Sequence, residues 1–227
     1  MVRAGTDGSA QGMQRYYAAR APEYDLVYQK PERQADIALL HAELPGRFAG
    51  LRLLEVACGT GFWTQFIAQA AKHVLALDAS PETMAVARQR VAPDRVTFRE
   101  GDAYALPEDW RGLDAAFAGF WFSHVPIARR REFLQGLHRC LAPGARVLLI
   151  DNQFVAGSNH AISETDAEGN TFQARQLADG STHRVLKNFP SREELVALIE
   201  GMGTPLPNPT ALAGLTYYWC FEYQLPG

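Results

Sequence analysis

The chain of 227 residues has few of the features that mark several other classes of protein. Its three cysteines, Cys58, Cys140 and Cys220, are isolated and odd in number, so they indicate neither a disulfide-bonded scaffold nor a cysteine metal site. No basic run is longer than Arg129-Arg130-Arg131, the net charge is −3 and the pI is near 6.1. The charge therefore provides no long-range attraction to nucleic acid or to an anionic membrane.

Long apolar stretches are also missing. None approaches the roughly 20 residues of a membrane span, and the N-terminus lacks the apolar segment of a secretory signal. Hydrophobic residues make up 47% of the chain, which is enough for a sizeable core. We therefore expect one cytoplasmic domain that has no metal and no partner that is a membrane or a nucleic acid.

The most informative segment begins with an apolar run at residues 53–56 and continues into a small, Gly-rich turn. The run is typical of a buried strand, and residues 62–72 have helical spacing. Such a strand–turn–helix unit brings backbone N–H groups and a helix N-terminus close to a ligand. A polar or nucleotide-like cofactor is therefore expected at this turn.

The spacing of the glycines distinguishes between two kinds of cofactor-binding turn. A dinucleotide-binding turn has a third glycine, and here Phe62 or Thr64 stands at that position, depending on the frame. The pattern that fits is acid-x-small-x-Gly-x-Gly over residues 55–61. Ala57 occupies the small position of this pattern, where an alanine in place of a glycine is a mild change if its φ angle is negative.

Two further acidic residues follow predicted strands. Asp78 ends an apolar run at residues 73–78, and its carboxylate can accept hydrogen bonds from both hydroxyls of a ribose. Asp102 follows an alternating run at residues 96–100. A glycine–aspartate pair at a strand end is often only a turn, but three acids in this order support one another.

A helix is predicted immediately after the second acid. Pro81 opens it, Ser80 is its expected N-cap, and it extends to residue 91. Met84 lies one turn into this helix. Its side chain either packs on an adenine ring or belongs to the ordinary helix core, and both interpretations stay open.

In order and spacing, residues 51–151 resemble the class I S-adenosylmethionine-dependent methyltransferases, in the small-molecule (type 11/25-like) branch. The resemblance implies S-adenosylmethionine as the methyl donor. It places Glu55 near the methionyl ammonium, Asp78 at the ribose and Asp102 at the adenine amino group. The residues that it implies at the cofactor are Tyr16, Tyr24, Glu55, Ala57, Cys58, Gly59, Gly61, Asp78, Ala79, Met84, Asp102, Ala103 and Phe120.

The N-terminal residues resemble the cap of the same branch. Residues 1–12 are expected to be disordered, and residues 13–48 are expected to form a helical lid. Tyr16, Tyr17 and Tyr24 lie in this lid, where aromatic faces would favour a nearby sulfonium cation. We expect residues 14–28 to be mobile without ligand and protected when cofactor is bound.

The remaining pattern alternates between strands and helices, which predicts a doubly wound, mostly parallel α/β sheet of seven strands. Ligands of such sheets bind at the carboxyl ends of the strands. An aromatic run at residues 215–224 predicts an antiparallel closing strand, as in the resembling family, and the methyltransferase domain is expected over residues 49–227. Three other helices are predicted, at residues 34–44 (closed by Pro45-Gly46), 129–141 (ended by Pro143-Gly144) and 192–201. The last of them follows a capping box at Ser191. Two further strands are predicted at residues 113–120 and 145–150.

One segment is longer than the loops typical of such folds, at about residues 152–190. Within it, residues 171–177 and 181–186 alternate on either side of Asp179-Gly180, which predicts an inserted β-hairpin. The hairpin either overhangs the substrate side, mediates a dimer, or is a surface decoration.

His124 is the expected catalytic residue, because it lies four residues past Phe120, where the resembling family begins its acceptor pocket. An imidazole with an unperturbed pKa near 6.5 can act as a base at neutral pH. The alternative is that His124 packs under Pro126 or caps a helix. The weaker candidates are Asp151, Asn152, His160, His183 and Tyr17.

The leading hypothesis is transfer of a methyl group from S-adenosylmethionine to a small-molecule acceptor, by a monomer or a homodimer. Two alternatives stay open: a nicotinamide-dependent oxidoreductase, and a non-catalytic protein that binds S-adenosylmethionine. Neither the acceptor nor its reacting atom follows from the sequence.

Overall fold

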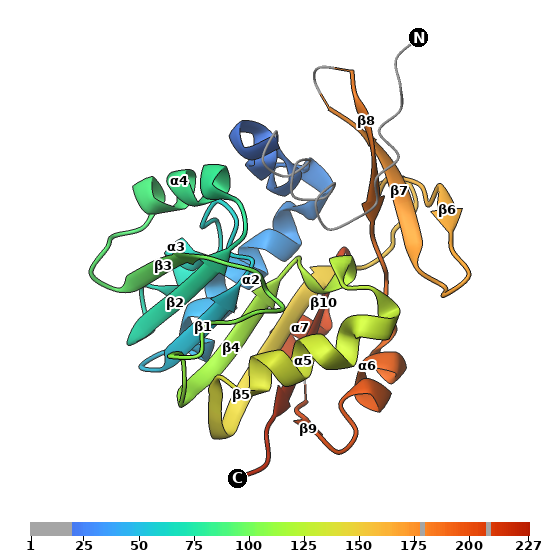
Figure 1. Ribbon diagram of the computed structural model, residues 1–227. Coiled ribbons are helices and arrows are strands. Elements are labelled where there is room, and N and C mark those ends of the chain that lie inside the picture. Colours follow the sequence, from blue (N-terminus) through green and yellow to red (C-terminus); the bar gives the residue numbers. More distant parts are fainter. Residues whose placement is uncertain (1–19, 178–179, 208–209) are drawn as a thin grey trace.

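A computed structural model describes residues 20–177, 180–207 and 210–227, and its main feature is a seven-stranded sheet in the order β3-β2-β1-β4-β5-β10-β9 (Figure 1). Strands β1 to β5 pair in parallel, and β10 runs antiparallel to both β5 and β9. The strands are β1 (Arg52–Val56), β2 (His73–Asp78), β3 (Val96–Glu100), β4 (Leu113–Gly119), β5 (Leu141–Asn152), β9 (Thr204–Pro205) and β10 (Tyr218–Gln224). The predicted α/β fold, with its antiparallel closing strand, is confirmed.

Helices cover both faces of this sheet. The α-helices are α2 (Gln34–Arg47), α3 (Thr64–Ile67), α4 (Pro81–Arg90), α5 (Arg130–His138), α6 (Arg192–Leu198) and α7 (Thr210–Ala213). Short 3-10 helices are η1 (Ala21–Tyr28), η2 (Pro31–Arg33), η3 (Phe122–His124) and η4 (Ile127–Arg129). In the described part of the chain, no helix is long and apolar enough to cross a membrane.

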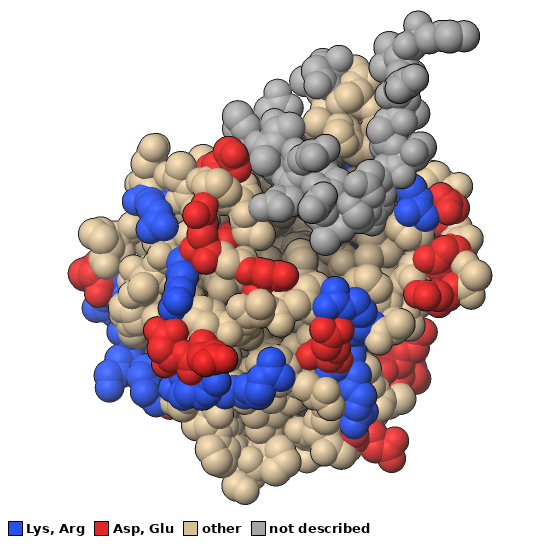
Figure 2. Space-filling view, in the orientation of Figure 1, with Lys and Arg blue, Asp and Glu red and all other residues tan. Residues whose placement is uncertain are grey.

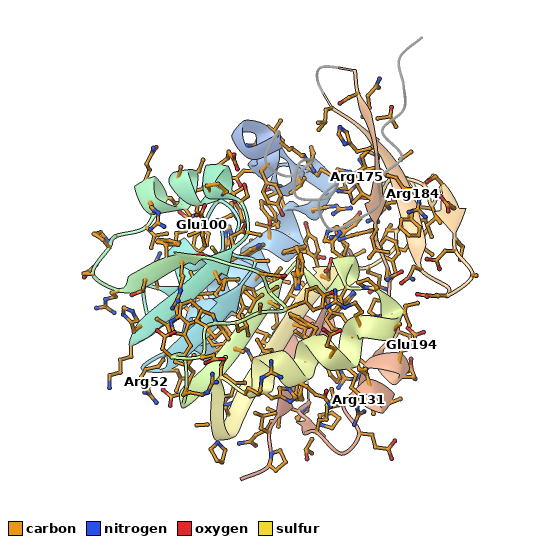
Figure 3. All side chains as sticks on the ribbon, viewed as in Figure 1. Arg52, Glu100, Arg131, Arg175, Arg184 and Glu194 are labelled. Carbon is orange, nitrogen blue, oxygen red and sulfur yellow. The ribbon has the colours of Figure 1, made fainter. Side chains whose placement is uncertain are left out.

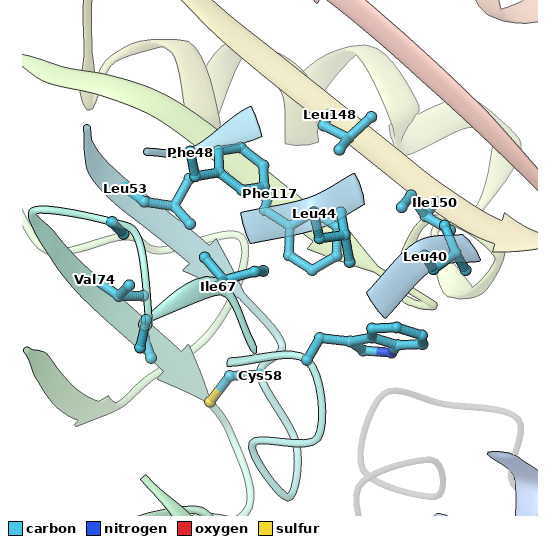
Figure 4. Close-up of a cluster of buried hydrophobic side chains, with 14 of the residues drawn as sticks. Leu40, Leu44, Phe48, Leu53, Cys58, Ile67, Val74, Phe117, Leu148 and Ile150 are labelled. Atoms are coloured by element: carbon cyan, nitrogen blue, oxygen red, sulfur yellow. The ribbon is translucent and has the colours of Figure 1, made fainter. Parts of the chain in front are cut away.

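The sheet is buried on both sides because successive strand residues face opposite layers. In β1, Leu53 packs with Leu40 and Leu44 of α2, whereas Leu54 packs with Leu137 of α5 on the other face. Figure 4 shows the first of these two clusters, with α2 lying across the strands. All five side chains named here are buried, and the exposed fractions of Leu40 and Leu44 are 0%. Helix α2 therefore contributes to the core.

Two predicted helix starts are confirmed in atomic detail. Ser80 caps α4, because its hydroxyl accepts a hydrogen bond from the backbone N–H of Thr83. Ser191 and Glu194 form the reciprocal capping box at the start of α6.

Several predicted ends are wrong. Helix α2 continues through Pro45 to Arg47, since a proline in the last turn removes only one hydrogen bond before the helix ends. Residues 62–72 form a regular α-helix only over the four residues of α3, and α6 ends at Leu198. Helix α5 ends at His138, and β5 begins at Leu141, which pairs with Leu113, so Pro143-Gly144 lie within the strand.

The segment between β5 and α6 forms a separate three-stranded sheet, β6-β7-β8. Its strands are β6 (Glu164–Thr165), β7 (Thr171–Gln176) and β8 (Thr182–Leu186). The predicted hairpin is present as β7 and β8, and the short β6, which the sequence did not indicate, adds an edge. Figure 1 shows this sheet beyond the carboxyl ends of the main strands, on the same side as η1 and η2.

Hydrogen bonds join the N-terminal segment to both neighbouring parts of the molecule. Asp25 of η1 pairs with Arg90 of α4 and accepts a hydrogen bond of 2.6 Å from the Thr60 hydroxyl. Arg33 of η2 donates to the carbonyl and hydroxyl oxygens of Ser158, which precedes β6. The N-terminal segment thus bridges the Gly-rich turn and the insertion.

Candidate active site

The turn between β1 and α3 lies at the carboxyl end of the sheet and has an unusual backbone. Gly59 and Gly61 adopt φ angles of 55° and 72°, which favour glycine. At Gly61 a Cβ atom would also lie 3.0 Å from the Cβ of Ala87, so this glycine lets the turn approach α4 closely. Both glycines of the predicted motif therefore have a physical reason.

Ala57 does not meet the expectation of a negative φ angle, because its φ is 55°. For a residue with a Cβ atom, this left-handed conformation costs about 1–2 kcal/mol. The replacement of glycine at this position is therefore strained rather than mild. Such strain is often found at functional sites, where the surrounding structure maintains it.

Asp78 connects three neighbouring segments at the end of β2. Its Oδ2 accepts a hydrogen bond of 2.8 Å from the backbone N–H of Gly59. Its Oδ1 accepts from the backbone N–H of Ser80 at 2.9 Å and from the Thr83 hydroxyl at 3.2 Å. Burial raises the pKa of the Asp78 carboxyl above its usual value, and these donors oppose that shift.

Three other predicted cofactor residues lie behind the turn. Glu55 and Met84 are buried, with exposed fractions of 2% and 1%, and Cys58 is buried as well. Burial raises the pKa of Glu55 to about 8, and its Oε2 atom has no hydrogen-bond partner in the described part of the chain. Met84 belongs to the interior of α4 and does not line the cavities described below.

A large cavity of about 770 Å³ lies at the carboxyl ends of β1, β2, β3 and β4. Among the predicted residues that line it are Ala57, Gly59, Asp78, Ala79, Asp102 and Ala103. Aromatic side chains of Tyr104 and Trp121 add an apolar wall. Its volume is in the range of sites for drug-sized ligands. We call this space the donor cavity.

A second space of about 190 Å³ lies between the N-terminal segment, the end of β5 and the insertion. Its walls include Lys30 just before η2, Arg33 from η2, Asn152 from β5, Arg175 from β7 and Lys187 after β8. We call it the small chamber. Because β7 contributes to it, the inserted sheet does overhang this end of the molecule.

Three residues, Tyr24, Phe120 and His124, line both spaces. Phe120 is strained, with a φ angle of 61°, and its ring stacks on Trp63 at a centroid distance of 5.6 Å. Tyr24 comes from η1, so the N-terminal segment closes this boundary from the other side. The donor cavity and the small chamber therefore meet at a wall made largely of aromatic rings.

His124 is held in one orientation at this boundary. Its Nδ1 lies 2.6 Å from the carbonyl oxygen of Leu186, and since a carbonyl only accepts, Nδ1 carries the hydrogen. In the neutral ring Nε2 is then an acceptor. Burial, followed by the charge of Lys187, lowers the pKa of His124 to about 3. The expectation of an unperturbed base is therefore wrong, and a neutral His124 can accept a hydrogen bond but is a weak base.

Lys187, Asp151 and Ser123 form a buried cluster beside this histidine. The Lys187 ammonium lies 2.8 Å from Oδ1 of Asp151 and 2.6 Å from the Ser123 hydroxyl. The backbone N–H of Ser123 donates to Oδ2 of Asp151 at 2.9 Å. Burial alone would raise the pKa of Asp151, but the charge of Lys187 and the hydrogen bonds that the carboxylate accepts together lower it to about 2. Burial also lowers the pKa of Lys187. The pair fixes the end of β5 against the insertion.

Comparison with known proteins identifies the family. Residues 53–144 match the family model described as a methyltransferase domain. A malonyl-[acyl-carrier protein] O-methyltransferase from Pectobacterium atrosepticum is 30% identical over 193 residues, which cover 79% of this chain and 69% of that protein. The structure of DhpI in complex with S-adenosylhomocysteine has a TM-score of 0.75 and 30% identity, and the match covers 97% of this chain and 98% of that one. This chain belongs to the class I S-adenosylmethionine-dependent methyltransferases.

A further relative matches this chain over a shorter stretch. A demethylmenaquinone methyltransferase from Clavibacter sepedonicus is 38% identical over 104 residues, and the match spans 42% of its length. DhpI has also been solved with S-adenosylmethionine. Membership of this family makes S-adenosylmethionine the co-substrate and decides against the nicotinamide-dependent oxidoreductase.

The structure of the methyltransferase brings most of the predicted residues to one end of the sheet. Tyr16 and Tyr17 lie outside the described residues. Asn152 and His160 line the small chamber, whereas Asp151 is buried beneath it and His183 lines neither space. The prediction omitted the basic residues of the small chamber, because their contribution depends on an insertion whose position the sequence does not reveal. In the described residues no cluster of His, Cys, Asp or Glu is arranged to hold a metal ion.

Proposed function

We propose that this methyltransferase binds S-adenosylmethionine in the donor cavity and transfers its methyl group to a small molecule held in the small chamber. The observation that carries the proposal is the shared boundary. Tyr24, Phe120 and His124 line both spaces, so the two spaces adjoin there, as transfer of a methyl group from one to the other requires.

The donor cavity suits an adenosyl group at its far end. The carboxylate of Asp78 faces the cavity and retains acceptor capacity for ribose hydroxyls beyond its three hydrogen bonds to the protein. Asp102 lines the cavity at the end of β3, where it can accept from an adenine amino group. The aromatic wall of Tyr104 and Trp121 offers flat surfaces for the base.

The proposed chemistry depends on alignment and on the exclusion of water. A sulfonium methyl group is already activated, so holding donor and acceptor in line can supply much of the rate. Rings of Tyr24 and Phe120 place π-electron density beside a cation at the boundary. His124, which is held neutral and weakly basic, does not need to take a proton. The chain therefore acts chiefly by positioning.

The roles given to the site residues are part of this proposal. A cytoplasmic location and the oligomeric state are also part of it. All three cysteines are buried and outside disulfide bonds, which suits a reducing cytoplasm. A chamber of about 190 Å³ suits a small acceptor, and neither nucleic acid nor a membrane is a proposed partner. The assembly is proposed to be a monomer or a homodimer.

A pair of variants tests the division into two spaces. Gln173 lines the small chamber and is buried, and Asp102 lines only the donor cavity. Once an acceptor is found by measuring release of S-adenosylhomocysteine, Gln173→Met should raise KM for the acceptor and leave the affinity for S-adenosylhomocysteine unchanged. Asp102→Asn should do the reverse. If both variants change the same constant, the two-space assignment fails.

The alternative of a non-catalytic binding protein makes a different prediction for the same assay. Such a protein would bind S-adenosylhomocysteine tightly but would release none from S-adenosylmethionine with any member of a broad acceptor panel.

A further inference from the structure

The small chamber is lined by five basic side chains, which is unusual for so small a space. Arg20, Lys30, Arg33, Arg175 and Lys187 come from four separate parts of the chain. Among the described residues, no aspartate or glutamate lines this chamber. Charged side chains are seldom placed together in a confined space unless something compensates them.

Two of these cations are held by neutral groups. Arg33 has an exposed fraction of 5%, and it donates to the amide oxygen of Asn152 at 2.7 Å and to the Ser158 hydroxyl at 3.0 Å. Lys30 donates to the carbonyl oxygen of Ser158. These contacts orient the two cations but do not neutralise them. Glu32 accepts a hydrogen bond from the Ser158 hydroxyl and does not line the chamber.

The remaining basic groups converge on the same space. Arg175 extends from β7, between the inserted sheet and the N-terminal helices in Figure 3, and Lys187 lies deeper, paired with Asp151. His160 also lies on the chamber wall, and its pKa is lowered chiefly by burial. The nearby positive charges, mainly those of Arg175 and Lys30, lower the pKa further. His160 thus lies close to several of the chamber's cations.

This accumulation of positive charge is local. The chain as a whole carries a net charge of −3, and on the face drawn in Figure 2 the acidic and basic side chains are interspersed. The cations of the chamber are therefore not part of a generally basic surface. Their arrangement is that of a binding site for an anion.

We propose that the methyl acceptor is a small oxyacid with at least two negative charges, bound by Lys30, Arg33 and Arg175, and that one of its anionic oxygens receives the methyl group. This inference rests on the proposed function for the position of the donor. Phosphonates, phosphates and small dicarboxylates share the required chemistry. One cation, Arg20, lies close to Tyr24 at the boundary and is assigned to the carboxylate of the methyl donor itself.

The reaction balances without a base. A lone pair on the anionic oxygen forms the new O–CH3 bond while the S–CH3 bond breaks, and its electron pair stays on sulfur. The sulfonium becomes a neutral thioether, the acceptor loses one negative charge, and no proton moves. A nucleophile that arrives already ionised fits a boundary whose only imidazole, His124, is held neutral and weakly basic.

Size and charge also favour release of the product. A space of about 190 Å³ corresponds to roughly six water molecules, which suits an acid of only a few heavy atoms. Methylation removes one negative charge and adds a methyl group in this confined, cationic space. The ester is therefore expected to bind more weakly than the acid from which it forms.

Calorimetric titration with simple anions tests the proposal. The probes are methylphosphonate, inorganic phosphate, malonate, acetate and the monomethyl ester of methylphosphonate, each added to the free enzyme and to its complex with S-adenosylhomocysteine. At least one of the three dianions should bind ten times more tightly than acetate, and methylphosphonate should bind ten times more tightly than its ester. The order among the three dianions distinguishes a tetrahedral acid from a dicarboxylate.

Two charge-matched variants provide the control. Arg175→Gln removes a chamber cation from the insertion, and Arg131→Gln removes an exposed cation of α5 that lies outside the chamber. The first should weaken dianion binding at least tenfold and the second should not change it. Equal effects of the two variants, or dianion binding no tighter than acetate binding, would overturn the proposal. If the dianions bind but S-adenosylhomocysteine does not, the donor assignment fails and the anion site stands.

Discussion

Replacing Asp78 with asparagine is expected to weaken binding of S-adenosylhomocysteine about 30- to 150-fold, which corresponds to about 2–3 kcal/mol. The magnitude follows from the two oxygens of the carboxylate. Oδ2 accepts from Gly59 and Oδ1 accepts from Ser80, so an amide must turn an NH2 group toward one of these backbone donors. The ribose also exchanges a charged acceptor for a neutral one, and hydrogen bonds to charged groups are worth about 1.5–3 kcal/mol.

Calorimetric titration of folded Asp78→Asn is the assay, with thermal unfolding of the free protein to show that the variant is folded. Asp94→Asn is the matched control, because Asp94 is exposed and lies after α4, away from the donor cavity. The control should bind S-adenosylhomocysteine as the wild type does. A folded Asp78→Asn variant whose affinity stays within about threefold of the wild type would refute the assignment of Asp78 to the cofactor.

Four further predictions follow from single features of the structure. His124→Ala should lose part but not all of the rate. The pH–rate profile of the wild type should show no ionisation near pH 6.5 that disappears in this variant. Gly61→Ala should destabilise the fold by about 2–4 kcal/mol in urea unfolding, whereas Gly46→Ala, in α2 with no atom within 4 Å of the added Cβ, should be neutral or stabilising by up to about 1 kcal/mol. Burial lowers the folded-state pKa of His138 to about 4, so the unfolded chain binds the extra proton between pH 6.5 and 4; stability should fall as the pH drops through this window, and His138→Gln should flatten that fall. Amide hydrogen exchange of residues 20–28 should slow when S-adenosylhomocysteine binds, and unchanged exchange would contradict a closing N-terminal segment.

The main sheet was predictable because its signals are local. Apolar runs that end in an acid or a Gly-rich turn mark β1 and β2, and the sequence supplies caps such as Ser80 and Ser191 at the helix starts. Helix and strand ends were less predictable. Leu141 lies in β5 because it pairs with Leu113, and a pairing partner 28 residues away leaves no local trace.

The candidate site was predicted only in part, for the same physical reason. Residues of the donor cavity follow strand ends, so Asp78 and Asp102 could be found from order and spacing. The small chamber is assembled from η2, β5 and the inserted sheet, and its cations, such as Lys30 and Arg175, are adjacent only in the fold. The pKa of His124 was likewise set by burial and by Lys187, neither of which spacing reveals.

A crystal structure of the enzyme with S-adenosylhomocysteine tests the central claim most directly. Our account predicts the ribose at Asp78, the adenine near Asp102, and the sulfur at the boundary formed by Tyr24, Phe120 and His124, directed toward the small chamber. A cofactor whose sulfur lies away from this boundary, or whose adenosyl group fills the small chamber, would contradict it.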